Sequence, residues 1–307
     1  MTQRIISLLA SGTEMVCGLG LADRLVAISH ECDYPPEVLH LPRVTGTRID
    51  VNASSKAIDD VVREMSVDQS ALYEIDEQQI AELAPDLIIT QAQCDVCAVR
   101  YEDVVSAINR YPALSNTNIV ALNPLTFDDI FRDIRMVAEA CEATTAGECC
   151  LRELRERVDV VHTRGQQLAT RPRVIGIEWL EPIMIAGNWM PEMIELTGGE
   201  AILAAAGKHS PYTAWEQIQA ADPDVILIMP CGFDLPRTLA ELDVLTTLPG
   251  WDATPAARNN HIFAVDGNAY FNRSGPRMVD SLEILASFVQ GREMSEQIPS
   301  GVWQQVI

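Results

Sequence analysis

Residues 80–90 read IAELAPDLIIT, and residues 218–228 read IQAADPDVILI. Each stretch begins with apolar residues at helical spacing, continues through a Pro-Asp pair and ends in a short apolar run that is typical of a buried strand. The match predicts a chain of two similar halves, in which a helix leads into a strand through the same kind of turn.

Other segments recur in the same order in both halves. Residues 4–8 (RIISL) resemble residues 173–177 (RVIGI), and residues 118–122 (NIVAL) resemble residues 261–265 (HIFAV). Strands that alternate with helical segments predict an α/β fold with a parallel sheet in each half. The first two matching strands lie farther apart along the chain in the first half, which predicts an insertion within residues 40–75.

A helical connector separates the two halves. Thr126 can cap one helix, and Thr144 or Thr145 can cap a longer one that runs to about Ala169, before Pro172. Its apolar residues form one stripe, which comprises Leu151, Leu154, Val158, Val161 and Leu168.

These patterns predict four parts of the chain. We expect an N-terminal lobe at 1–124, a connector with a long backbone helix at 125–171, a C-terminal lobe at 172–290 and a loose tail at 291–307. Ligands of parallel sheets bind beyond the carboxyl ends of the strands, so we expect a ligand cleft between the lobes.

Composition and charge exclude several classes of partner. The 307 residues include 22 Lys and Arg against 44 Asp and Glu, which gives a net charge of −22. Nucleic acids and anionic membranes both require a basic surface, so neither is an expected partner. No apolar run approaches the roughly 18 residues of a membrane span, so we expect no membrane insertion.

The N-terminal residues and the known catalytic motifs also inform the function. Residues 1–10 contain one basic residue and a short apolar run, unlike a signal peptide. We therefore expect a cytoplasmic protein, or a periplasmic or other extracytoplasmic one if a leader has been removed. Phosphate-loop, dinucleotide, zinc-protease and serine-hydrolase motifs are absent from the sequence, which favours a binding protein and leaves enzymatic activity uncertain.

Local motifs resemble one known family. They are Ser11-Gly12-Thr13-Glu14 after the first strand, Asp33-Tyr34-Pro35-Pro36 after the second, and the run from Asn268 to Arg273 near the end of the second half. In this order they resemble the helical-backbone class of ABC-transporter substrate-binding proteins, and within it the cobalamin-binding proteins. The resemblance implies a rigid two-lobed clamp that holds a corrinoid such as cobalamin and passes it to an ABC permease.

The resemblance and the loop residues together suggest a ligand site. A large, flat and mostly apolar ligand needs aromatic faces and a few polar groups to orient it. The alternative is that the loop aromatics pack against the core. The candidate ligand-binding residues are Ser11, Gly12, Thr13, Tyr34, Gln91, Trp179, Gly187, Asn188, Trp189, Gly232, Phe233, Asn268, Tyr270, Phe271 and Arg273.

Cysteine and histidine residues suggest a second possibility. Cys94 and Cys97 form a C-x-x-C pair after a predicted strand, and His30 and Cys32 follow the preceding one. Three interpretations of the cysteine pair remain open. It contacts a transition metal or a corrinoid cobalt, it is a redox pair, or it consists of two structural thiols. The alternative function is therefore a cytoplasmic metal-binding protein or metalloenzyme that uses these four residues, or a binder of another chelate such as a siderophore or haem.

Overall fold

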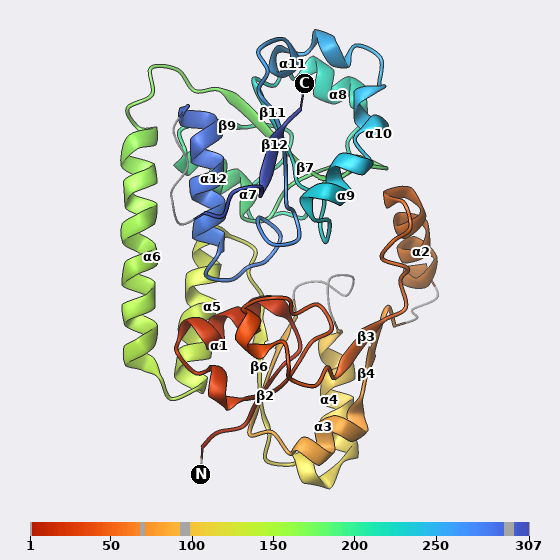
Figure 1. Ribbon diagram of the computed structural model, residues 1–307, viewed down its shortest axis with the longest axis vertical. Helices are drawn as coiled ribbons and strands as arrows, with labels where there is room; N and C mark the ends of the chain where they lie inside the picture. Colours follow the sequence, from red (N-terminus) through yellow and green to blue (C-terminus); the bar gives the residue numbers. More distant parts are fainter. Residues whose placement is uncertain (1, 68–70, 93–98, 292–297, 307) are drawn as a thin grey trace. The chain divides into compact units, whose positions relative to one another are not determined.

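The computed structural model describes residues 2–67, 71–92, 99–291 and 298–306, which form two compact α/β units (Figure 1). The predicted fold class is confirmed, because each unit contains parallel strands and a long helix continues from one unit into the other. Unit 1 comprises Met1–Ala53, Asp60–Pro124 and Asp128–Glu153, and unit 2 comprises Ser54–Asp59, Leu125–Phe127 and Leu154–Ile307.

Unit 1 is built on a parallel sheet in the order β2-β1-β5-β6. Figure 1 shows α1 and α5 on one side of this sheet and α3 and α4 on the other. Covering both faces explains why the strands are continuous apolar runs. The elements are β1 (Ile5–Ser7), α1 (Ala10–Gly18), β2 (Leu25–Ile28), α3 (Glu77–Leu83), β5 (Leu87–Gln91), α4 (Tyr101–Arg110), β6 (Asn118–Leu122) and α5 (Phe127–Ala140).

The insertion expected within residues 40–75 has its own secondary structure. Strands β3 (Thr45–Thr47) and β4 (Tyr73–Ile75) pair antiparallel, and helix α2 (Ser55–Val67) lies between them in the sequence. The start of α2 belongs to unit 2, where the indole Nε1 of Trp179 donates a hydrogen bond to the carbonyl oxygen of Ser55 at 3.2 Å.

Unit 2 has a mixed sheet in the order β12-β11-β10-β7-β8, and β9 also pairs with β7. Strands β7, β10 and β11 are parallel, whereas β8 and β12 are antiparallel to their neighbours. The elements are β7 (Arg173–Trp179), β8 (Met184–Ile185), α7 (Met190–Leu196), β9 (Glu200–Ala201), α8 (Trp215–Ala220), β10 (Val225–Ile228), α9 (Leu235–Ala240), α10 (Asp243–Thr246), α11 (Pro255–Arg258), β11 (Ile262–Val265), α12 (Met278–Gln290) and β12 (Trp303–Gln305).

The end of the chain differs from the expected loose tail at 291–307. Strand β12 pairs antiparallel with β11, and the ring of Trp303 packs edge-on against Phe263 and Phe288 at centroid distances of 5.7 and 5.1 Å. Burial of the apolar area of these three rings stabilises the docked strand. The strand is short and its partner β11 lies far from it in the sequence, so no local pattern predicts the pairing.

The two Pro-Asp motifs perform the same task in the two units. Asp86 Oδ2 accepts a hydrogen bond from the backbone N–H of Arg4 at 2.8 Å, and Asp224 Oδ2 accepts one from the N–H of Arg173 at 2.8 Å. Each aspartate therefore ties the start of the central strand to the strand beside it. The predicted repeat is confirmed at the level of single hydrogen bonds.

The long helix α6 (Thr144–Gly165) has 22 residues, or about 33 Å at 1.5 Å per residue. It ends earlier than the expected Ala169, at Gly165, where an added Cβ would lie 2.7 Å from the backbone nitrogen of Gly198. Residues 125–171, expected as a separate connector, are divided between the two units.

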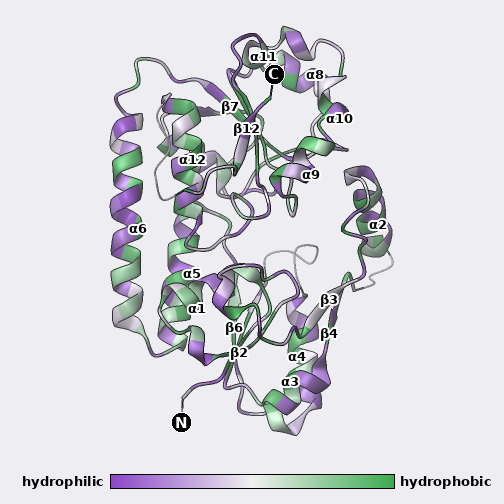
Figure 2. Ribbon diagram, in the orientation of Figure 1, coloured by the Kyte–Doolittle hydropathy of each residue, from purple (hydrophilic) through white to green (hydrophobic). Residues whose placement is uncertain are grey.

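The polarity of the residues differs between the strands of the sheets and helix α6. Figure 2 shows hydrophobic strands in both sheets and many hydrophilic residues along α6. Within the described ranges, no helix is both long and apolar enough to cross a membrane.

Candidate functional site

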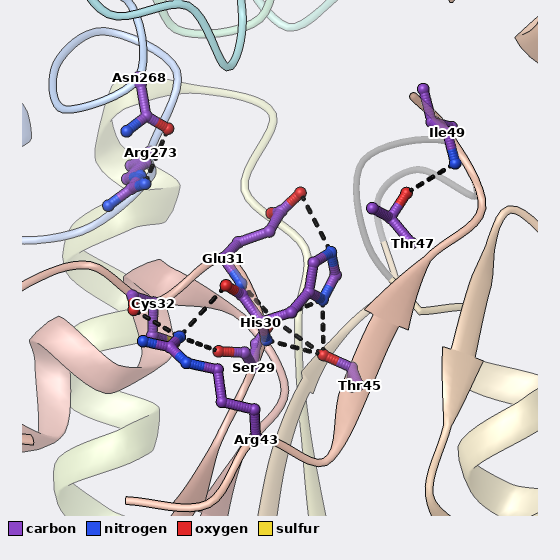
Figure 3. A network of polar contacts seen from close by, with 10 residues as sticks. All are labelled: Ser29, His30, Glu31, Cys32, Arg43, Thr45, Thr47, Ile49, Asn268 and Arg273. Atoms are coloured by element: carbon purple, nitrogen blue, oxygen red, sulfur yellow. Dashed lines mark hydrogen bonds and ion pairs between the residues drawn. The ribbon is translucent and has the colours of Figure 1, made fainter. Parts of the chain in front are cut away.

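The loop after β2 is held by two side chains, one from Arg43 just before β3 and one from Thr45, the first residue of β3. The guanidinium Nη1 of Arg43 donates to the carbonyl oxygens of Ser29, His30 and Cys32 at 2.8, 3.1 and 2.6 Å. The hydroxyl Oγ1 of Thr45 accepts a hydrogen bond from the backbone N–H of His30 at 3.0 Å (Figure 3). These bonds fix residues 29–32 at the carboxyl end of β2, where ligands of parallel sheets bind.

The imidazole of His30 is fixed by the same threonine. Its Nδ1 lies 2.7 Å from Thr45 Oγ1. Its Nε2 is buried and has no hydrogen-bond partner among the described residues, and Glu31 Oε1 lies 3.8 Å away (Figure 3). Burial and the positive charge of Arg43 lower the pKa of His30, so the ring is neutral at pH 7.

Ser11, Gly12 and Thr13, which are candidate ligand-binding residues, lie in the first turn of helix α1 and are buried. An added Cβ at Gly12 would lie 2.8 Å from Cγ2 of Ile89, so glycine lets α1 approach the sheet closely. Thr13 Oγ1 lies 3.1 Å from the buried Sγ of Cys32. Close packing against the sheet and against Cys32 is therefore one role of these positions.

Two more candidates of unit 1 lie at strand ends. Gln91 is the last residue of β5 and is buried. Tyr34 follows the loop at residues 29–32 that Arg43 and Thr45 hold, and it is 43% exposed. It therefore presents an aromatic surface to the solvent beyond the carboxyl end of β2.

The predicted four-residue metal site is described only in part. Cys94 and Cys97 lie outside the described residues. Among the residues that are described, no group of three or more His, Cys, Asp or Glu side chains could hold a metal ion. The structure therefore gives no support to a protein-only metal site.

In unit 2, the loop at residues 267–273 is held by buried side chains. Phe271 has a φ of 68°, and its backbone N–H donates to Ser281 Oγ at 2.9 Å. Its carbonyl oxygen accepts from the indole Nε1 of Trp189 at 2.9 Å. The side-chain amide of Asn272 donates to the carbonyl oxygens of Met229 and Gly267 at 2.9 and 2.8 Å. These bonds support a residue whose backbone lies in the left-handed region.

Most of the aromatic candidates in unit 2 are core residues. Trp189, Phe233, Tyr270 and Phe271 are each at most 7% exposed. Trp179 is half-buried, and its indole N–H binds Ser55. Packing of loop aromatics against the core, the alternative interpretation of these residues, describes the four buried ones.

The polar and glycine candidates of unit 2 lie in turns between its helices and strands. Asn188 has a φ of 49°, and its Oδ1 is buried without a hydrogen-bond partner in the described part of the chain. Its neighbour Gly187 has room only for hydrogen, since an added Cβ would lie 2.3 Å from the carbonyl oxygen of Lys208. Arg273 Nη2 donates to Asn268 Oδ1 at 2.8 Å. Gly232, with a φ of 76°, occupies a left-handed turn.

Arg43 and Thr45 are the site residues that sequence reasoning missed. Their role depends on a parallel bridge between Ile28 and Arg43, which brings the segment after the loop back beside β2. An arginine and a threonine in a polar segment carry no motif, so their role could not be predicted from the sequence.

Comparison with known protein families identifies the family of this chain. A family model described as "Periplasmic binding protein" matches residues 5–269. The chain belongs to the periplasmic binding protein family. The vitamin B12-binding protein of Vibrio cholerae is 25% identical over 292 residues, which cover 94% of this chain and 89% of that protein.

Solved structures of periplasmic binding proteins share the fold. The periplasmic vitamin B12 binding protein BtuF of Vibrio cholerae has a TM-score of 0.65 and 24% identity, and covers 94% of this chain and 96% of its own. The periplasmic haem-binding protein RhuT of Roseiflexus sp. RS-1, in apo form, has a TM-score of 0.68 and 23% identity, with coverages of 94% and 99%.

Membership of the periplasmic binding protein family bears on two expectations. It supports an extracytoplasmic location and gives no support to the cytoplasmic one. It also does not favour the alternative of a metal-binding protein or metalloenzyme.

Proposed function

We propose that the protein is the substrate-binding component of an ABC transporter and that its ligand is a corrinoid such as cobalamin. The observation that carries this proposal is the match to vitamin B12-binding proteins along nearly the whole chain, at 25% identity for Vibrio cholerae and 22% for Vibrio parahaemolyticus. The partner is then a membrane permease that receives the ligand.

The loop after β2 supports a large ligand. Arg43 and Thr45 hold residues 29–32 through hydrogen bonds within the protein, and a preorganised loop lowers the entropic cost of binding. The exposed ring of Tyr34 beside this loop offers an aromatic face to a flat, apolar macrocycle.

The turns of unit 2 add polar groups to rigid backbone. Asn188 Oδ1 has no hydrogen-bond partner within the described ranges, and the amide groups along the edge of a corrinoid are donors that could supply one. The loop at 267–273 is held by Trp189 and Ser281 and carries the Asn268–Arg273 pair.

Haem and ferric siderophores are the competing ligands. Structural neighbours include haem-binding proteins, such as RhuT, but their identity to this chain shows the fold alone. The order of preference is therefore corrinoid first and haem second.

Calorimetric titration of the purified protein with aquacobalamin, ferric haem and a ferric siderophore tests the proposal. We expect one-to-one binding of aquacobalamin with a Kd below about 1 μM and weaker binding of the others. Tyr34→Ala should weaken binding about tenfold, whereas Leu39→Ala, at a similarly exposed position (39%), should not. Preferential binding of haem would replace the corrinoid, and failure of all three ligands to bind would overturn the proposal.

A further inference from the structure

The hydrogens around His30 can be counted. The hydroxyl of Thr45 has one hydrogen, which it donates to Ser29 Oγ at 3.1 Å. Thr45 Oγ1 is therefore an acceptor toward Nδ1 of His30, 2.7 Å away, and Nδ1 carries the ring hydrogen. Ser29 Oγ lies 3.4 Å from the same nitrogen and is a second oxygen on that side.

The count leaves a lone pair on Nε2. This atom is buried, and the described residues offer it no hydrogen-bond donor. Glu31 Oε1, at 3.8 Å, is an acceptor and cannot satisfy a lone pair. Buried polar atoms in native proteins are nearly always paired, and the described residues offer Nε2 no partner, so its lone pair is available to a bound ligand.

The arrangement around the ring matches that of a metal ligand. Histidines that bind metals usually donate the hydrogen of one ring nitrogen to a neighbouring oxygen, which orients the ring and leaves the other nitrogen for the metal. Here Thr45 provides that oxygen, and Arg43 fixes the backbone that carries His30. The Glu31 side chain is 44% exposed, so it can turn into solvent when a ligand approaches.

We propose that Nε2 of His30 is the protein's axial ligand to the cobalt of the bound corrinoid. This inference rests on the proposed function and adds a bond that binding by shape alone does not need. Cobalt and iron in tetrapyrroles accept imidazole nitrogen at an axial position. Cys32 on the same loop is a poorer ligand, because its buried Sγ lies against Thr13 Oγ1.

Exchange of the axial ligand provides the test. Aquacobalamin carries an exchangeable water on cobalt, whereas both axial positions of dicyanocobinamide are blocked by cyanide. Wild-type protein should shift the visible bands of aquacobalamin toward those of an imidazole complex. His30→Ala should abolish the shift, weaken aquacobalamin binding at least tenfold and leave dicyanocobinamide binding within about twofold.

Two variants make the test specific. His40→Ala removes an exposed histidine of unit 1 and should behave as wild type. Thr45→Val removes the acceptor of the Nδ1 hydrogen and should weaken aquacobalamin binding by about 10- to 100-fold.

A measurement on wild-type protein guards against misfolded variants. Reduced cobinamide contains Co(II) and has no nitrogen base of its own. In electron paramagnetic resonance, one axial ¹⁴N from His30 should split each parallel cobalt line into three when this probe is bound.

The outcomes separate the two proposals. Aquacobalamin binding without a band shift, or bound cobinamide without nitrogen splitting, would overturn axial ligation and leave the proposed function standing. An equal loss of the shift in His40→Ala would overturn the assignment to His30. Failure of both corrinoids to bind would overturn the proposed function and the ligation together.

Discussion

The loop at residues 29–33 of unit 1 and the loop at 267–273 of unit 2 hold their backbones in similar ways but differ in what they leave unused. In unit 2, Trp189, Ser281 and Asn272 bind the loop's backbone groups or their neighbours, and the aromatic rings are buried. In unit 1, Arg43 and Thr45 hold the backbone, and one ring nitrogen of His30 has no partner among the residues described. Rigid support therefore occurs in both loops, and of the two, as far as the described residues show, the first leaves a ring nitrogen unpaired for the proposed axial bond.

Among the changes to the loop of unit 2, we expect substitution of Trp189 to destabilise the protein most. Trp189→Ala should lower the free energy of unfolding by about 3–5 kcal/mol, because it removes a buried ring and the donor to Phe271. Chemical denaturation followed by circular dichroism measures the loss. Trp189→Phe keeps most of the ring and should cost about 1–2 kcal/mol for the unpaired carbonyl oxygen. Equal losses would show that the hydrogen bond, and not the packing, supports the loop.

Close backbone approach is the second feature of that loop. An added Cβ at Gly267 would lie 2.3 Å from the carbonyl oxygen of Pro230, so Gly267→Ala should cost about 3 kcal/mol. Gly46→Ala in β3 is the control, because no described atom lies within 4 Å of its added Cβ and its φ is not positive. Thermal melting of both variants checks this, and a Gly267→Ala melt within a degree of wild type would contradict the rigid loop.

Arg43 tests the support of the loop in unit 1. Arg43→Met should lower the free energy of unfolding by about 2 kcal/mol, because three carbonyl oxygens lose a charged donor. Arg48→Met, which breaks an exposed ion pair with Glu74, should cost less than about 0.5 kcal/mol. Denaturation of both variants at equal ionic strength makes the comparison. Equal losses of unfolding free energy would show that Arg43 does not support the loop.

Asp133 supports the chain where it leaves β6, since its Oδ2 accepts from the N–H of Asn123 at 3.2 Å. Burial raises the pKa of Asp133 from 3.8 to about 6, although Arg132 acts in the opposite direction. A raised pKa means that the folded protein binds the proton more tightly. The stability from this proton is complete below pH 3.8 and is lost as the pH rises through about 6.

Asp133→Asn removes that titration and should be the smallest effect. Relative to wild type, the variant should gain about 1 kcal/mol between pH 5 and pH 6, because the carboxyl group is mostly protonated in the folded protein and mostly ionised in the unfolded chain over this range. Melting temperatures across this range provide the measurement. A wild-type minus variant difference that does not change with pH would show that Asp133 titrates normally.

The site was only partly predictable from its residues. His30, Tyr34 and Asn188 are predicted by residue type and by their place after a strand, and the proposed function uses the exposed ring of Tyr34 and the unpaired atoms of His30 and Asn188. Trp189 and Phe271 have equally suggestive types and positions, yet both are buried. Sequence shows which loop carries an aromatic ring but not which way the ring turns, because that depends on packing against distant residues.

The sequence by itself determined the repeated α/β units, the Pro-Asp turns and the long helix, because periodicity and turn chemistry are local properties of the chain. It also determined the family, through motifs in a fixed order. Tertiary structure decided the docking of β12 and the burial of the unit 2 aromatics. It also decided the tautomer of His30, since Thr45 and Arg43 reach that loop only when the chain folds back beside β2. Non-local contacts of this kind leave no pattern in the residues that make them.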